Sequence, residues 1–238
     1  MACTASRHSL ARLTRPTVIP AGARSLFSFP NPFGSPASSS SAAPIKKGSL
    51  VKRGSIWVYN EGKVMPYTPR ELYAVIADVD SYKDFLPFTS ASRVLSAAQL
   101  SPDQQSRTSR PVGEKGWLVV RDEQNEGERW EMDAELRIGA LGFDEGYVSR
   151  VEMLKARSVK ATARDASMFR HLVNVWSFYP LPPSPSPPST PQTQVDLSLE
   201  YAFTSPLHAA AMNTVWDKVS ALMVERFEQR VIDVHGKR

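Results

Sequence analysis

Residues that could do catalytic chemistry are scarce in this chain. It has four histidines and one cysteine, Cys3, so a disulfide framework and cysteine-based metal sites are excluded. No Gly-x-Ser-x-Gly nucleophile motif, phosphate-binding glycine loop or histidine-rich metal pattern is present. Glu131, Asp133 and Glu135 recur at a spacing of two, which puts them on one face of a strand, where a solvated acidic face explains them better than an acid and base pair. The residues therefore predict a protein without a catalytic constellation.

A segment that suits an apolar ligand lies near residue 174. In a strand over residues 171–179, one face carries Leu172, Asn174, Trp176 and Phe178. Ligand pockets are mostly apolar, with a few polar groups that orient the ligand. Asn174 could hydrogen-bond a ligand, or it could bond neighbouring backbone as most buried polar groups do. Both interpretations remain open.

The last long segment, Ser205–Val234, has the signals of one helix. Ser205 can cap it, Pro206 suits its first turn, and Gly236 follows as a stop. Its apolar residues form two lines at helical spacing. A core helix explains one line, and the second line either packs in the core or faces a ligand cavity. The first line is Leu207, Ala211, Val215, Val219 and Leu222, and the second is Met212, Trp216, Met223, Phe227 and Val231.

The preceding elements would position these residues as one antiparallel sheet. Thr68–Glu71 is a capping box that begins a helix ending near Asp80. Alternating apolar and polar residues predict half-buried strands, and the order of strand, helix, several strands and a long helix indicates an α+β fold. The predicted strands are 49–60, 89–96, 130–138, 146–154, 158–163, 171–179 and 193–204, with a polar loop over 98–115 and a short hairpin arm over 116–122.

The positive charge belongs to the front of the chain. The first 60 residues contain eight basic residues and no acidic one, which leaves 21 basic and 24 acidic residues in the remainder. This balance argues against a generally basic nucleic-acid binder. Residues 1–35 have the composition of a mitochondrial transit peptide, although a disordered basic tail has the same composition. Residues 36–48 read as a linker rich in Pro, Ser and Ala, and residues 49–235 as the folded domain.

Several segments together resemble the mitochondrial coenzyme Q-binding proteins, a branch of the START-like (polyketide cyclase-like) superfamily. The matching segments are Met65–Pro87, Ala134–Gly139, Tyr147–Val151, Met168–Phe178 and Val195–Arg230. The resemblance implies a START-like helix-grip fold, in which a curved antiparallel sheet surrounds a long C-terminal helix and encloses an apolar cavity. It also implies a non-enzymatic carrier of ubiquinone, without a catalytic cofactor, on the matrix side of the mitochondrial inner membrane. Such a carrier supports respiratory electron transport and ubiquinone synthesis.

The resemblance also implies which residues contact the ligand. We expect a hydrophobic tunnel and a membrane-facing gate, with the gate over Lys83–Phe88. The expected tunnel and gate residues are Phe85, Leu86, Pro87, Phe88, Leu172, Trp176, Phe178, Met212, Trp216, Met223 and Phe227. The candidates for contact with the quinone head group are Tyr147, Arg150 and Asn174.

The chain departs from the family at three places. Pro87-Phe88-Thr89 stands where the family often has Pro-Trp-Cys, and residues 98–130 and 182–191 look like loop insertions. Two other functions remain open beside the carrier. One is a START-like enzyme acting on an aromatic, polyketide or quinone precursor, and the other is a protein associated with mitochondrial ribosomes.

Overall fold

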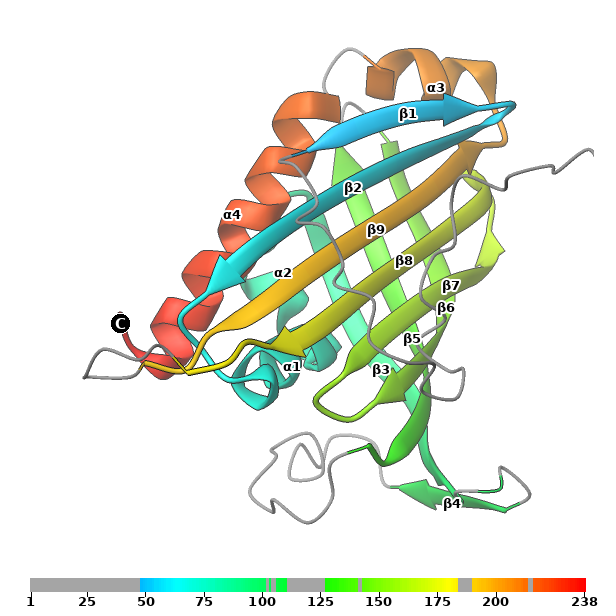
Figure 1. Ribbon diagram of the computed structural model, residues 1–238. Coiled ribbons are helices and arrows are strands. Elements are labelled where there is room, and N and C mark those ends of the chain that lie inside the picture. The colour runs from blue at the N-terminus through cyan, green and yellow to red at the C-terminus, as the bar shows by residue number, and fades with distance from the viewer. Residues whose placement is uncertain are drawn as a thin grey trace, which may run out of the picture. The chain divides into compact units, whose positions relative to one another are not determined.

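A curved antiparallel sheet with helices on one face makes up the part of the chain described by the computed structural model (Figure 1). The described residues are 48–101, 103, 106–110, 127–140, 143–183, 190–213 and 216–238. The predicted leader and nearly all of the predicted linker lie outside these residues, as does the predicted arm over residues 116–122.

Nine strands form the sheet, in the order β1-β2-β9-β8-β7-β6-β5-β3-β4. Each strand pairs antiparallel with its neighbours. Hairpins therefore account for most connections, and the α+β class expected from the sequence is confirmed. The strands are β1 (Ser49–Arg53), β2 (Ile56–Met65), β3 (Thr89–Leu100), β4 (Arg107–Arg110), β5 (Arg129–Ala140), β6 (Phe143–Leu154), β7 (Ser158–Ala166), β8 (Phe169–Pro180) and β9 (Thr193–Phe203).

Helical segments connect β2 to β3 and complete the chain after β9. They are α1 (Pro69–Ala77), a 3-10 turn (Val79–Ser81), α2 (Tyr82–Phe85), α3 (Pro206–Asn213) and α4 (Trp216–His235). The capping box predicted at the start of α1 is confirmed. The Glu71 backbone N–H donates to Thr68 Oγ1 at 3.3 Å, and the Thr68 N–H donates to Glu71 Oε2 at 2.8 Å. This reciprocal pair satisfies two N–H groups that a helix start otherwise leaves unpaired.

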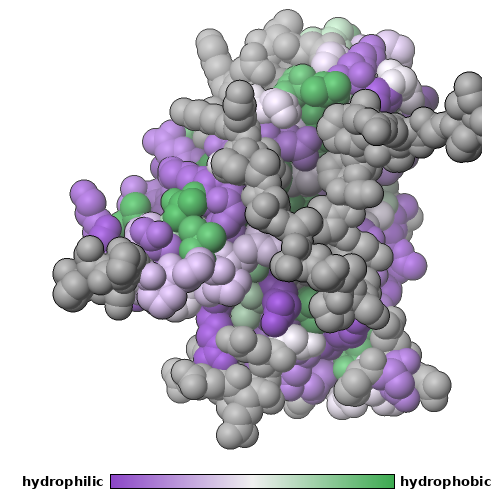
Figure 2. Space-filling model, viewed as in Figure 1, coloured by the Kyte–Doolittle hydropathy of each residue, from purple (hydrophilic) through white to green (hydrophobic). Residues whose placement is uncertain are grey.

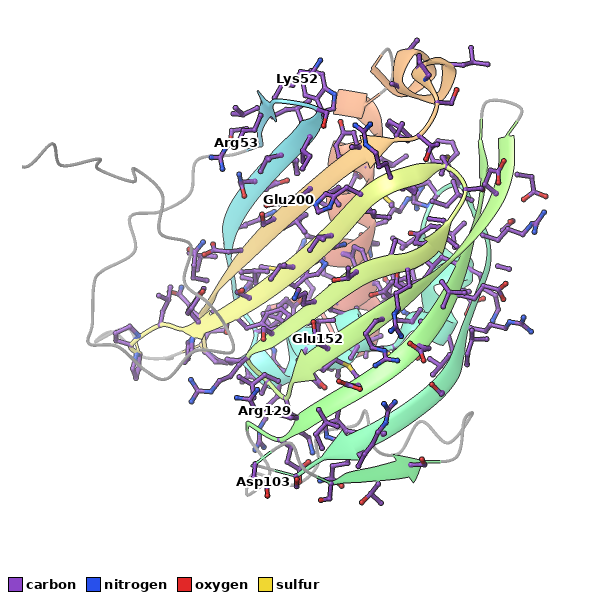
Figure 3. All side chains as sticks on the ribbon, turned by 90° about the vertical axis from the view of Figure 1, so that its right-hand side faces the viewer. Lys52, Arg53, Asp103, Arg129, Glu152 and Glu200 are labelled. Carbon is purple, nitrogen blue, oxygen red and sulfur yellow. The ribbon has the colours of Figure 1, made fainter. Side chains whose placement is uncertain are left out.

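The two faces of the sheet have opposite character. The inner face carries core residues, and α4 runs along it (Figure 1); Trp130, Met132 and Ala134 of β5 are all buried there. The outer face carries ion pairs such as Arg150 Nε to Asp133 Oδ1 at 2.7 Å. Glu152 and Glu200 also lie on it, on the side of the strands away from α4 (Figure 3). The solvated acidic face predicted on β5 is thus confirmed. On the face of the molecule shown in Figure 2, the residues that are coloured by hydropathy are mostly hydrophilic.

Two of the predictions about strands were wrong, because each missed a strand that the structure has. The expected single strand over residues 49–60 is the hairpin of β1 and β2, which turns at Gly54, where φ is +59°. Residues 98–115 were expected to be a loop, but β3 continues to Leu100 and β4 pairs back onto it. Backbone pairing needs no apolar side chains, so the polar composition of this segment concealed the strands.

The prediction of a single helix over Ser205–Val234 is also wrong. The structure has α3 and α4 in its place, and the two helices run in different directions (Figure 1). Asn213, Thr214 and Val215 are all weak helix formers, because Asn competes for backbone hydrogen bonds and β-branched side chains lose rotamer freedom in a helix. A break at this point therefore has a local cause in the sequence.

Candidate functional site

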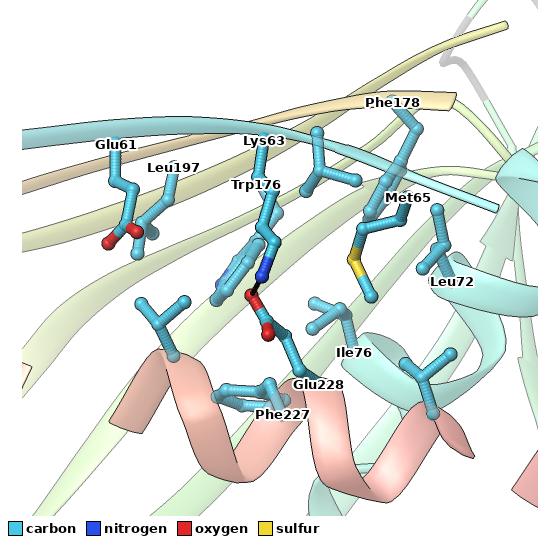
Figure 4. Close-up of a pocket in the computed structure, with 13 residues that line it drawn as sticks. Glu61, Lys63, Met65, Leu72, Ile76, Trp176, Phe178, Leu197, Phe227 and Glu228 are labelled. Carbon is cyan, nitrogen blue, oxygen red and sulfur yellow. Dashed lines mark hydrogen bonds and ion pairs between the residues drawn. The ribbon is translucent and has the colours of Figure 1, made fainter. Parts of the chain in front are cut away.

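An apolar pocket lies between the inner face of the sheet and two helices (Figure 4). The empty space beside its lining residues is about 450 Å³ when the adjoining open solvent is counted. Strands β2, β8 and β9 supply one wall, and α1 and α4 supply the other. The lining residues are Glu61, Lys63, Met65, Leu72, Ile76, Trp176, Phe178, Val195, Leu197, Val224, Phe227, Glu228 and Val231.

The ring of Phe227 holds the pocket side of α4 against its neighbours. It meets the Trp176 ring of β8 at 5.1 Å, and the Tyr82 and Phe85 rings at 5.3 Å each, all edge to face. Edge-to-face pairs at this distance are favourable beyond the area that they bury. Phe227 is 8% exposed. One side chain thus connects α4, β8 and α2 beside the pocket.

Charged side chains lie where the pocket meets solvent. Lys63 Nζ of β2 and Glu228 Oε1 of α4 are 2.5 Å apart, and this ion pair bridges from the sheet to the helix (Figure 4). The Lys63 side chain is 53% exposed and the Glu228 side chain 26%. Glu61 lies beside them and accepts a hydrogen bond from the Tyr59 hydroxyl at 2.5 Å. The arrangement is an apolar interior with a polar rim, as ligand pockets typically are.

The described residues that line the pocket include no His, Cys or Ser side chain. Within the described ranges, no group of three or more His, Cys, Asp or Glu side chains is arranged to hold a metal ion. The same ranges contain no helix with the length and apolar character needed to cross a membrane. What the described geometry offers is a place for an apolar molecule.

The structure brings three of the predicted tunnel residues together at the pocket. Trp176, Phe178 and Phe227 all line it. Met223 is half-buried and packs against the core one turn before Phe227, and Leu172 is half-buried on the inner face of β8. The side chains of Met212 and Trp216 lie outside the part of the chain that the structure describes.

The predicted gate residues divide into buried and exposed ones. Leu86 is only 6% exposed and belongs to the core, and Phe85 packs on Phe227 with the Arg230 guanidinium 5.5 Å from its ring centre. Pro87 is half-buried. Phe88 is 44% exposed with φ at +63°, a left-handed conformation that costs roughly 1–2 kcal/mol for a non-glycine residue. Of the gate segment, Phe88 is therefore the large apolar side chain that faces solvent.

The three head-group candidates are not brought together. Arg150 lies on the outer face, where its guanidinium binds Asp133 and Glu131, so it points away from the pocket side of the sheet. Tyr147 and Asn174 both lie on the inner face. Their partners on β7 are Ala166 and Ala161, five residues apart, which separates the two positions by roughly 16 Å along the strand.

Tyr147 belongs to an aromatic cluster near the end of β9. Its ring meets Phe169 at 5.7 Å, and Phe169 stacks on Phe203 at 5.0 Å. Burial raises the pKa of the Tyr147 hydroxyl to about 12, so the hydroxyl stays protonated at neutral pH and remains a hydrogen-bond donor. Asn174 lies between this cluster and the pocket, and its Oδ1 is buried without a hydrogen-bond partner in the described part of the chain.

Sequence reasoning missed the contributions of β2, α1 and β9 to the pocket. The alternation of Val195 and Leu197 in β9 had shown an inward face but not which part of that face stays uncovered. Met65, Leu72 and Ile76 are ordinary core-type residues, and no local signal distinguishes a pocket wall from a filled core. Lys63 and Glu228 are 165 positions apart, so only the fold reveals that they pair.

Comparisons with known proteins agree with this architecture. The sequence profile of the family described as polyketide cyclase / dehydrase and lipid transport matches residues 65–228. The chain is 29% identical over 181 residues to the mitochondrial coenzyme Q-binding protein homolog B of Xenopus laevis, in a match that spans 76% of this chain and 60% of the frog protein. The chain thus spans less than two thirds of that relative. It is 23% identical over 175 residues to the ribosome association toxin of Escherichia coli, covering 74% of this chain and 87% of the toxin.

The likeness to a solved structure supports the fold assignment and nothing beyond it. A START superfamily protein from Mycobacterium smegmatis superposes with a TM-score of 0.50 at 11% identity, covering 74% of this chain and 98% of that chain. At this identity the likeness concerns the fold alone. The START-like fold expected from the sequence is therefore confirmed. Because the family profile matches more than half of its length, the chain belongs to the polyketide cyclase/dehydrase and lipid transport family, and within that family it is similar to the coenzyme Q-binding proteins.

Proposed function

We propose that the protein is a non-enzymatic carrier that binds ubiquinone in the interior between its sheet and α4. The observation that carries the proposal is the pocket between the sheet and the helices, which has an apolar interior and a charged rim. Small-molecule sites are typically apolar inside, with a few polar groups that orient the ligand. The similarity to coenzyme Q-binding proteins supports the identity of the ligand.

An isoprenoid tail suits this pocket on physical grounds. Each CH₂ group removed from water stabilises a bound state by about 0.8 kcal/mol, so a chain of isoprene units gains most of its affinity from burial alone. Trp176, Phe178 and Leu197 offer large apolar surfaces, and Met65 offers a flexible side chain that adapts to irregular shapes. Binding of this kind needs no catalytic cofactor.

The proposal includes a location and a route for the ligand. Residues 1–35 act as a mitochondrial leader, residues 36–48 as a linker, and residues 49–235 as the carrier domain, with the segments 98–130 and 182–191 as additions to it. The domain works at the matrix side of the inner membrane as a peripheral protein and supports respiratory electron transport and ubiquinone synthesis. Phe88, exposed and in a left-handed conformation, is the gate residue that contacts the membrane.

Filling the pocket with a larger side chain tests the proposal directly. Leu197 lines the pocket and is 8% exposed, whereas Leu95 is 41% exposed and serves as the matched control. We expect Leu197→Trp to weaken binding of a short-tailed ubiquinone at least tenfold, because the added ring occupies the ligand's space. Leu95→Trp should leave the affinity unchanged. The measurement is a titration by isothermal calorimetry, with circular dichroism to establish that both variants are folded.

Equal affinities of folded Leu197→Trp and wild-type protein would contradict a ligand in this pocket. Where Leu197→Trp does not fold, Leu197→Phe makes the same test with a smaller added volume. The gate is tested at Phe88 rather than at Leu86, because Leu86 belongs to the core and a charge there would unfold the protein. Phe88→Ser should slow quinone transfer between vesicles and leave binding in solution unchanged.

A further inference from the structure

The amide oxygen of Asn174 is buried on the inner face of β8 without a hydrogen-bond donor in the described part of the chain. Its neighbours on that face are Leu172 and Trp176 along β8, Ala161 on β7 and Leu199 on β9. All of these side chains are apolar or, for the Trp176 indole, directed at Phe227. Asn174 is thus an isolated polar group on an apolar surface.

Asn174 lies on the inner face of the sheet, the face along which α4 runs. Two residues along a strand advance by roughly 6.6 Å, so Asn174 lies about that far from Trp176. Trp176 meets Phe227 of α4, and the preceding turn of α4, about 5.4 Å away, brings Met223 onto the core. Asn174 therefore lies one step along the inner face from the pocket residue Trp176, in the interior to which the quinone was assigned above.

An acceptor in this position lacks a stabilising interaction. A buried oxygen left without a donor destabilises the folded state relative to one that is hydrogen-bonded. Most buried polar groups are paired, so an unpaired one is expected to have a ligand, a water molecule or a functional role. The missing partner must bring a hydrogen to Oδ1. The side chains of Leu172, Ala161 and Leu199 have no donor, and the Trp176 indole N–H does not bond this oxygen.

We propose that Asn174 Oδ1 accepts a hydrogen bond from a phenolic O–H of the ligand, so that the site prefers the hydroquinone form of the head group over the quinone form. The proposal rests on the proposed function and adds the redox form that the site selects. A quinone ring has only acceptor oxygens, whereas its two-electron, two-proton reduction product has two O–H donors. The carboxamide N–H groups of Asn174 can bond an oxygen of either form, so the discrimination comes from Oδ1.

The other head-group candidates do not share this role. Arg150 is engaged with Asp133 and Glu131 on the outer face. Tyr147 lies roughly 16 Å from Asn174 along the strand direction. At this separation the two side chains could contact the same oxygen of one ring only by extending far toward each other along the sheet. Asn174 is consequently the residue to change.

The experiment compares the affinities of one short-tailed ubiquinone in its oxidised and chemically reduced forms, measured anaerobically with the full chain. One net hydrogen bond is worth about 0.5–1.5 kcal/mol, so wild-type protein should bind the hydroquinone about two- to tenfold more tightly. Asn174→Leu, which keeps the size and loses the acceptor, should bind both forms equally. Asn60→Leu, the same change on the opposite face of β2, should keep the wild-type ratio.

Three results separate the possible failures. A wild-type ratio of one or below, or an unchanged ratio in folded Asn174→Leu, would overturn the preference while leaving the carrier function intact. Absence of binding of either form to wild-type protein would overturn the carrier function itself. A second measurement needs no variant: the side-chain ¹³Cγ resonance of Asn174 in wild-type protein should shift on addition of the hydroquinone and much less with the quinone. Equal shifts with both forms would also overturn the preference.

Discussion

At the residue scale, a few side chains determine whether the interior stays organised. Phe227 contacts rings from β8 and α2 and lines the pocket, so in the proposed carrier it would serve both packing and ligand contact. On the outer face, Arg150 binds Glu131 and Asp133 and is thereby kept away from the ligand side. The roles of the two residues differ. Phe227 packs in the apolar interior, and Arg150 joins β6 to β5 through ion pairs on the outer face.

Phe227→Ala should destabilise the domain by about 3–5 kcal/mol, because it removes a buried ring and leaves a cavity among Tyr82, Phe85 and Trp176. Urea unfolding followed by circular dichroism measures this. Val234→Ala on the same helix is the control, since Val234 is 50% exposed and its loss should change stability by less than about 0.5 kcal/mol. A cost below about 1 kcal/mol for Phe227→Ala would show that the contacts of Phe227 do not hold α4 in place.

Asp133 gives a prediction for the dependence of stability on pH. Its hydrogen bond with Arg150 is the main cause that holds the pKa of its carboxyl below the ordinary value. A lowered folded-state pKa means that the stabilisation is present at neutral pH and is lost as the pH falls through that pKa. Asp133→Asn should therefore cost about 0.5–1 kcal/mol near pH 7, a modest amount because the pair is partly exposed, and progressively less below about pH 4.

Urea unfolding of both proteins across this pH range checks the expectation. The exposed Asp84 provides the control, because Asp84→Asn should change stability little at any pH in the range. A cost of Asp133→Asn that grows on acidification would mean that the ion pair does not act as described.

At the scale of elements, the pocket depends on how α4 lies relative to β2. The Lys63–Glu228 ion pair joins these two elements at the rim, and it spans the space between strand and helix in Figure 4. Exposed ion pairs contribute about 0–1 kcal/mol, which is little for stability but enough to alter how often the rim opens. We therefore expect this pair to influence ligand exchange more than folding.

Glu228→Gln removes one charge of the pair at nearly constant size. We expect ubiquinone to dissociate about two- to fivefold faster, with the free energy of unfolding changed by less than about 1 kcal/mol. Stopped-flow fluorescence of the pocket tryptophan, Trp176, follows the dissociation. Glu225→Gln, an exposed change one turn earlier on α4, should leave the rate as it is. An unchanged rate in Glu228→Gln would mean that ligand leaves elsewhere.

How far the sequence predicted these elements follows from how local their causes are. Strict alternation in β5 and β9 and the capping box at Thr68 depend on neighbouring residues, so the sequence was sufficient for them. The break between α3 and α4 was missed because cap signals at residues 205 and 236 outweighed three weak helix formers between them. The pocket walls from α1 and β2 depend on which strands meet, and that is a property of the whole sheet rather than of any segment.

At the scale of the whole molecule, the described part of the chain is a sheet curved around a helix with room left between them. A fully packed core would serve stability better, since uncovered apolar walls and the unpaired Asn174 oxygen both reduce it. Such features are retained where a ligand completes the interior. The chain is similar both to coenzyme Q-binding proteins and to a ribosome association toxin, so relatives with differently named partners resemble it. The ligand of this protein must therefore be identified by direct measurement.

Organic extraction of the purified folded protein, followed by mass spectrometry of the extracted lipids, tests the central claim most directly. The protein should be produced in a host that makes ubiquinone and purified without detergent. The account predicts an isoprenoid quinone or its hydroquinone in near-stoichiometric amount, and much less of it with Leu197→Trp than with Leu95→Trp. Folded protein that carries no isoprenoid quinone and binds none when it is supplied would contradict the account.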